Sequence, residues 1–105
     1  MENILDAISD VEQFMDDVTK EAFFKNKEKQ YAILRALEII GEATKNLSLE
    51  LKTNNREVQW KDIAGMRDKL IHEYFGVNLD LVWDTVKKDL PILKKQLNKI
   101  IDSKK

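Results

Sequence analysis

The sequence predicts an all-α protein, an antiparallel up-and-down bundle of four or five helices. Its 105 residues are 43% hydrophobic and 35% charged, a mixture typical of a folded domain rather than a disordered chain. Three glycines and one proline are too few turn residues for an all-β sandwich. Apolar residues also recur every three or four positions in several segments. We therefore expect a single helical domain over residues 1–105.

The first predicted helix covers about residues 2–20. Its apolar side chains are spaced by four and three positions, which places them on one helical face: Ile4, Ile8, Val11, Met15 and Val18. That face is expected to pack into the core, and acidic residues occupy much of the rest of the helix.

A second, longer helix is expected after Asn26, whose side chain can cap it. One apolar stripe contains Ile33, Leu37, Ile40, Leu47 and Leu51, and an adjacent stripe contains Ala32, Ala36, Ile39 and Ala43. Such a wide, alanine-rich arc favours a central helix with neighbours on two sides, one of which could be a second subunit. Thr53, Asn54 and Asn55 then predict a loop.

The third predicted helix begins near Trp60 and ends at about Phe75, where Gly76 and Asn78 supply turn chemistry. The fourth has a heptad-like stripe: Leu79, Trp83, Val86, Leu90, Leu93, Leu97 and Ile100. Pro91 interrupts this helix, so we expect a bend there, or a restart with Asp89 as cap.

Composition excludes several kinds of chemistry. The chain has no cysteine, which removes disulfides, thiolate metal sites and cysteine nucleophiles, and its one histidine is too few for an ordinary histidine-rich metal site. We expect no metal and no cofactor. No apolar run approaches the roughly 18 residues of a membrane span, and no targeting signal is visible, so we expect a cytoplasmic protein.

Charge is unevenly distributed, although the formal net charge is only −1. Residues 1–24 contain seven acidic residues and one lysine, whereas residues 86–105 contain seven lysines and two aspartates. The simpler interpretation is that the first and last helices lie side by side and attract each other. The alternative is a basic rim beside a site for a polyanion.

The densest set of functional groups lies in residues 65–76. On a helix, Arg67 and Tyr74 fall within about 20° of each other, and Asp68 and His72 form an i,i+4 pair. Arg67 and His72 are about 140° apart around the axis and roughly 7.5 Å apart along it, so one helix makes only half a site. Two such helices at a dimer interface would bring two arginines and two histidines into one cleft.

These residue types suit metal-independent RNA cleavage. Histidine can take the proton from a ribose 2′-hydroxyl near neutral pH, and arginine can stabilise the charge that develops on the attacked phosphate. Asp68 could orient or charge-stabilise the imidazole of His72. Because DNA lacks the 2′-hydroxyl, it would not be cleaved.

The chain resembles the HepT-type proteins of the HEPN superfamily, whose mark is Arg, a polar residue, three further residues, His, any residue and Tyr. Arg67, Asp68, His72 and Tyr74 fit this mark, with Asp68 where many relatives have asparagine. The resemblance spans about residues 5–97 and is clearest at residues 32–43, 60–67, 80–83 and 89–91.

The resemblance implies the toxin of a type VII toxin–antitoxin pair, a homodimeric ribonuclease that cuts tRNA or mRNA. Arg67 and His72 inherit the catalytic roles, with Asp68 in support. The implied partner is a minimal, MntA-like nucleotidyltransferase antitoxin that transfers AMP from ATP onto Tyr74. A bulky anionic group there would block RNA and neutralise Arg67.

Two other interpretations stay open. The chain could be a non-catalytic helical partner that presents a substrate or nucleotide to a nucleotidyltransferase, in which case the motif is a binding or modification surface. It could also be a plain structural bundle, with His72, Arg67 and Tyr74 in local packing or surface ion pairs. A structural bundle gives no reason for these side chains to occur together beside a turn.

Overall fold

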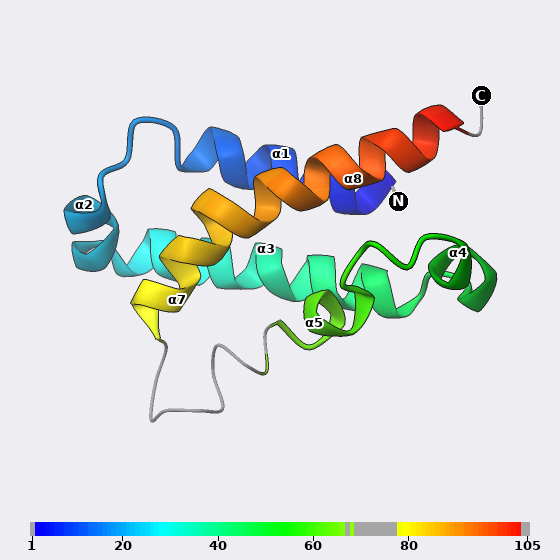
Figure 1. The fold of residues 1–105 in the computed structure, drawn as a ribbon. Coiled ribbons are helices and arrows are strands. Elements are labelled where there is room, and N and C mark those ends of the chain that lie inside the picture. The colour runs from blue at the N-terminus through cyan, green and yellow to red at the C-terminus, as the bar shows by residue number, and fades with distance from the viewer. Residues whose placement is uncertain (1, 67, 69–77, 104–105) are drawn as a thin grey trace.

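The computed structural model describes residues 2–66, 68 and 78–103, and every regular element in these ranges is a helix, as the sequence predicts. Figure 1 shows these elements in order. They are α1 (Glu2–Phe14), α2 (Lys20–Lys25), α3 (Lys27–Lys45), α4 (Leu49–Asn54), α5 (Trp60–Ala64), α7 (Leu79–Asp84), the π-helical turn η1 (Thr85–Asp89) and α8 (Leu90–Ser103).

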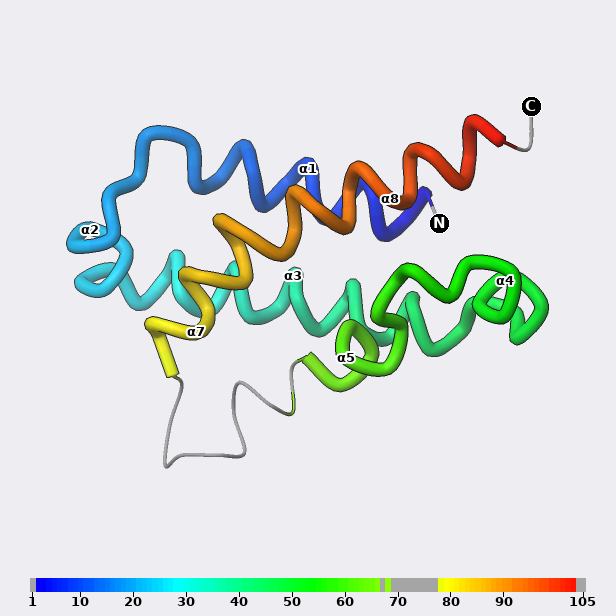
Figure 2. Tube along the Cα trace, in the orientation of Figure 1, coloured from blue at the N-terminus to red at the C-terminus, as the bar shows by residue number. Residues whose placement is uncertain are grey.

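Three long helices form the frame. Helix α3 runs antiparallel to α1, and α8 runs beside α1 in the direction of α3 (Figures 1 and 2). The short helix α5 packs against α3, and α2 contacts the beginning of α3. The chain from α4 into α5 therefore turns back along α3 (Figure 2).

The core lies between α1, α3 and the segment from α7 to α8. Its most buried side chains are apolar and come from these helices and from α2: Ile4, Ile8, Val11, Phe23, Ile33, Leu37, Ile40, Val82, Leu90 and Leu97. Most residues of the predicted stripes of the first two helices form the core. Ala32 and Ile39 are exposed instead, and five others are only half-buried: Val18, Ala36, Ala43, Leu47 and Leu51. Burying these chains is the main favourable term for the fold.

The first helix is shorter than predicted. Helix α1 ends at Phe14, and Asp17 adopts a φ of 60°, a left-handed conformation that ends a helix and that aspartate tolerates better than most residues. A new helix, α2, then begins after Thr19, whose hydroxyl accepts a hydrogen bond from the backbone N–H of Ala22 at 3.1 Å.

The second helix has the predicted beginning but an earlier end. The Asn26 side chain accepts a hydrogen bond from the backbone N–H of Lys29 at 3.0 Å, as a cap should. Helix α3 stops at Lys45, and Ser48 caps the separate helix α4. Thr53 and Asn54 lie inside α4, so the predicted loop begins only at Asn55.

The bend near Pro91 takes the form of a π-helical turn, and Asp89 lies inside that turn instead of capping a new helix. The N–H of Leu90 donates to the carbonyl of Thr85, five residues earlier. This wider turn places an extra residue in the helix and shifts the phase of its apolar stripe. Upstream of it Val82 is fully buried, whereas the predicted core residues Leu79 and Trp83 are half-buried.

The first and last helices do attract each other. Lys94 on α8 and Glu12 on α1 form an ion pair of 2.9 Å, which supports the simpler interpretation of the uneven charge. Among the described residues, no helix is both long and apolar enough to cross a membrane.

Candidate functional site

Three of the four predicted site residues, Arg67, His72 and Tyr74, lie outside the described residues. Asp68 is described, and it is helical and exposed. The geometry of the predicted Arg and His site therefore stays a prediction. What the structure shows is how the chain is held on both sides of the motif.

The segment that enters the motif is anchored by Trp60. Its ring is buried, and its indole N–H donates to the carbonyl of Asn55 at 2.9 Å. This bond closes the loop between α4 and α5 and fixes the first turn of α5. The Trp60 side chain is thus part of the buried core.

Helix α5 also lies unusually close to α3. A Cβ atom at Gly41 would be 3.2 Å from the carbonyl oxygen of Ala64 and 3.4 Å from that of Ile63. Only glycine leaves room for these two backbone oxygens without a shift. Gly41 therefore sets the distance between α3 and the end of α5, two residues before Met66 and three before Arg67.

The segment that leaves the motif is held by Asn78 and Trp83. The Asn78 side chain accepts a hydrogen bond from the N–H of Leu81 at 3.1 Å and so caps α7, which agrees with its predicted turn role. Trp83 packs against the buried ring of Phe23, with the ring centroids 5.9 Å apart. The amine of Lys87 lies over the Trp83 ring, 4.9 Å from its centroid.

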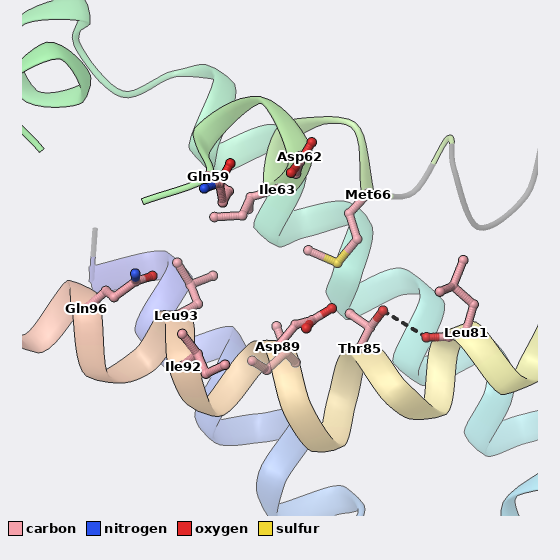
Figure 3. A pocket seen from close by; sticks show the side chains of 11 residues that line it. Gln59, Asp62, Ile63, Met66, Leu81, Thr85, Asp89, Ile92, Leu93 and Gln96 are labelled. Carbon is pink, nitrogen blue, oxygen red and sulfur yellow. Dashed lines mark hydrogen bonds between the residues drawn. The ribbon is translucent and has the colours of Figure 1, made fainter. Parts of the chain in front are cut away.

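A groove of about 320 Å³ lies between α5 and the turn from η1 into α8. Figure 3 shows Ile63 and Met66 on one side of it and Thr85, Asp89 and Leu93 on the other. Its walls are mainly apolar, and its polar side chains are carboxylates, amides and one hydroxyl: Gln59, Asp62, Thr85, Asp89 and Gln96. Met66 lines this groove and directly precedes Arg67 in the sequence.

Two polar side chains of the groove already donate a hydrogen bond within the protein. The Thr85 hydroxyl donates to the carbonyl of Leu81 at 2.8 Å, shown as a dashed line in Figure 3. The Gln96 amide nitrogen donates to the carbonyl of Glu57 at 3.4 Å. Within the described ranges no three histidine or acidic side chains gather as a metal site would require.

Sequence reasoning did not find this groove. Asp89 was expected only as a helix cap, and Asp62 only as part of a similar segment. These two carboxylates line one groove because of the π turn and because α5 packs against Gly41. Neither feature has a local sequence pattern. Pro91, two residues after Asp89, is the one sequence signal near the turn.

Comparison with known proteins gives a consistent result. The family model described as "Ribonuclease HepT-like" matches residues 4–100. The chain is 46% identical over 100 residues to a protein of Thermococcus cleftensis named "Probable ribonuclease HepT", covering 95% of this chain and 91% of that one. It is 45% identical over 105 residues to a Caldanaerobacter subterraneus protein whose name begins "Putative RNase", covering 100% and 94%.

A third relative is larger. The chain is 45% identical over 102 residues to a Methanocaldococcus jannaschii protein whose name combines "Gamma-glutamylcyclotransferase and putative RNase". The match covers 97% of this chain but 46% of that protein. No solved structure matches the chain significantly.

Proposed function

The chain belongs to the HepT-like ribonuclease family, and from this we propose that it is a metal-independent endoribonuclease that acts as the toxin of a toxin–antitoxin pair. The family match over residues 4–100 carries the proposal, because it includes the complete sequence from Arg67 to Tyr74. We place the activity in the cytoplasm, with tRNA or mRNA as the substrate, and assign it to one HEPN-like domain.

The proposed reaction uses this chain's own side chains. His72 accepts the proton of a ribose 2′-hydroxyl, and the resulting oxygen attacks the adjacent phosphorus. Arg67 stabilises the added negative charge of the pentavalent phosphate. The bond to the 5′-oxygen then breaks, leaving a 2′,3′-cyclic phosphate and a 5′-hydroxyl. Asp68, which is helical and exposed, supports the imidazole through its negative charge.

We propose that the complete site forms in a homodimer. One helix separates Arg67 from His72 around its axis, so a second copy supplies the missing half. Ile39 of α3 supports the dimer, because its side chain stays 40% exposed on a helix whose other side is in the core.

The partner that silences the enzyme is proposed to be an MntA-like nucleotidyltransferase, which transfers AMP from ATP to the hydroxyl of Tyr74. Diphosphate leaves as the new phosphate ester forms. The added phosphate neutralises Arg67, and the adenosine fills space that RNA needs.

The test is cleavage of tRNA and mRNA in EDTA by purified protein whose mass shows no added AMP. We expect the wild type to leave cyclic-phosphate ends, and His72→Ala and Arg67→Ala to lower the rate at least about 100-fold, the scale of losing a general base or a charge-stabilising group. Arg56→Ala is the matched control, because Arg56 is an exposed arginine outside the motif. Circular dichroism verifies that each variant is folded.

The second candidate is a non-catalytic helical partner of a nucleotidyltransferase. The resemblance implies a nucleotidyltransferase as the partner of this chain. A toxin and a non-catalytic helper would both bind that transferase, so the resemblance also favours the helper. If neither the unmodified wild type nor His72→Ala cleaves tRNA or mRNA, the result supports the helper and contradicts the ribonuclease.

A further inference from the structure

We propose that the groove between α5 and the η1–α8 turn binds one base of the RNA substrate, and that this base is guanine. The proposal rests on the ribonuclease function proposed above, because it assigns a specificity pocket to that site. The observations that carry it are the shape of the groove, its apolar walls and the excess of hydrogen-bond acceptors on its polar side chains.

The groove has the size and walls for one flat base. Its volume of about 320 Å³ is at the lower end of small-molecule sites, which start at roughly 300 Å³. Ile63 and Met66 project from the α5 side and Leu93 from α8 (Figure 3). A flat ring between these side chains would contact apolar groups on both faces. The flexible methionine side chain packs well against an aromatic ring.

The polar side chains of the groove mostly accept hydrogen bonds. Asp62 and Asp89 are exposed carboxylates, which accept only. The Thr85 hydroxyl spends its hydrogen on the carbonyl of Leu81, so it faces a ligand with lone pairs. The Gln96 amide nitrogen donates one of its two hydrogens to Glu57. The amides of Gln59 and Gln96 can each donate or accept, so the two carboxylates and the Thr85 hydroxyl make acceptors the majority and favour a ligand that supplies donors.

Guanine fits this pattern best among the four RNA bases. Its Watson–Crick edge carries two adjacent donors, N1–H and the N2 amino group, and one carboxylate can accept both with its two oxygens. Adenine and cytosine offer a single amino group beside an acceptor, and uracil offers one N–H between two acceptors. A hydrogen bond to a carboxylate is about twice as strong as one between neutral groups, and guanine can make two of them. We therefore expect guanine to bind more tightly than the other three bases.

The same carboxylates make the groove a base site rather than a phosphate site. Two negative charges repel a phosphate, which would instead lie toward the basic residue of the motif. Met66 lines the groove and Arg67 directly follows it in the sequence. A guanine in the groove would thus leave its own sugar and phosphate beside the start of the motif.

The test follows the methyl signals of Met66 and Met15 by NMR in protein labelled at the methionine methyl groups. Met15 is 1% exposed in the core and does not line the groove, so it is an internal control. Guanosine, adenosine, cytidine and uridine 3′-monophosphates are titrated separately. We expect guanosine monophosphate to shift Met66 and not Met15, with at least fivefold tighter binding than the other three nucleotides.

Variants identify the carboxylate. Asp62→Asn and Asp89→Asn each replace one acceptor oxygen by a donor, and we expect one of them to weaken guanosine monophosphate binding at least fivefold and to remove the preference. Asp102→Asn, at an exposed position on α8 outside the groove, should leave it unchanged. Equal shifts with all four nucleotides, no shift of Met66, or unchanged binding in both groove variants would each overturn the proposal.

Three further results distinguish a failure of this proposal from a failure of the proposed function. If spermidine or free arginine shifts Met66 and the nucleotides do not, the groove is a cation site and the guanine assignment is wrong. If guanosine monophosphate binds but RNA is not cleaved, the base pocket stands and the ribonuclease is wrong. If RNA is cleaved with no base preference and no nucleotide binds, the ribonuclease stands without this pocket.

Discussion

Gly41 of α3 lies directly against the backbone of Ala64 in α5, so that a Cβ atom at position 41 would be 3.2 Å from the Ala64 carbonyl oxygen. The contact joins the central helix of the core to the last turn before the Arg67–Tyr74 motif. A backbone oxygen cannot turn away as a flexible side chain can. The position of the end of α5 therefore depends on the absence of a side chain at Gly41.

The first prediction concerns this contact. Gly41→Val should destabilise the protein by about 1–3 kcal/mol, the usual cost of forcing extra methyl groups into a packed interface. It should also lower RNA cleavage, because α5 must move away from α3. The free energy of unfolding in urea and the cleavage rate are measured together. Ala32→Val, at an exposed position of the same helix, is the control and should cost only about 0.5 kcal/mol from helix propensity.

The second prediction tests the anchor of the loop before α5. Trp60→Phe keeps most of the buried ring but removes the indole N–H that donates to Asn55. Leaving that part-buried carbonyl without its donor should cost about 1–3 kcal/mol in urea unfolding. Trp83→Phe, which shortens a half-buried ring, should cost less. An equal loss in both variants would mean that ring size, not the hydrogen bond, sets the stability of Trp60.

The third prediction concerns the π turn. In Pro91→Ala a backbone N–H returns, yet we expect the π turn over Thr85–Asp89 to persist. Its conversion to an α-helix would rotate α8 by about 100° relative to α7 and take Leu93 or Leu97 out of the core. Stability should change by less than about 1 kcal/mol, because proline is tolerated in a first helical turn. Backbone chemical shifts of residues 85–90 are the measurement, and α-like hydrogen bonding there would contradict it.

Local chemistry made some of this fold predictable from sequence. The cap at Asn26 depends on a side chain and a nearby N–H, and it occurs where the sequence places it. Asn78, expected only to supply turn chemistry, caps α7 in the same way. The helix end at Phe14 was missed because the apolar spacing continues through Met15 and Val18, while Asp17 turns the backbone. The burial of Val82 was missed because a π turn shifts the helical phase without a distinctive pattern.

The candidate site divides in the same way. A motif of neighbouring residues such as Arg67, Asp68, His72 and Tyr74 can be recognised in the sequence itself. The groove cannot, because Asp62 and Asp89 are 27 positions apart in the sequence and line one space only after α5 docks on Gly41. Contacts between distant segments have no local periodicity to reveal them.

The fourth prediction quantifies the ion pair between the first and last helices. Lys94 and Glu12 are 2.9 Å apart with side chains that are 40% and 42% exposed. A double-mutant cycle with Lys94→Ala and Glu12→Ala should give a coupling below about 1 kcal/mol that decreases as salt is added. Lys95→Ala with Glu12→Ala is the control cycle and should show no coupling, because Lys95 is exposed and occupies the next position on α8.

The final prediction concerns the proposed modification. The chain has two tyrosines, Tyr31 and Tyr74, so each can be tested with the other as its control. Incubated with a cognate nucleotidyltransferase and ATP, wild type and Tyr31→Phe should gain the mass of AMP and lose ribonuclease activity. Tyr74→Phe should keep its mass and its activity, because phenylalanine has no oxygen to accept the phosphate. Tyr31 is 66% exposed on α3, so it is accessible to the transferase. Modification of Tyr74→Phe but not of Tyr31→Phe would place the AMP on Tyr31 and remove the proposed inhibition at the motif.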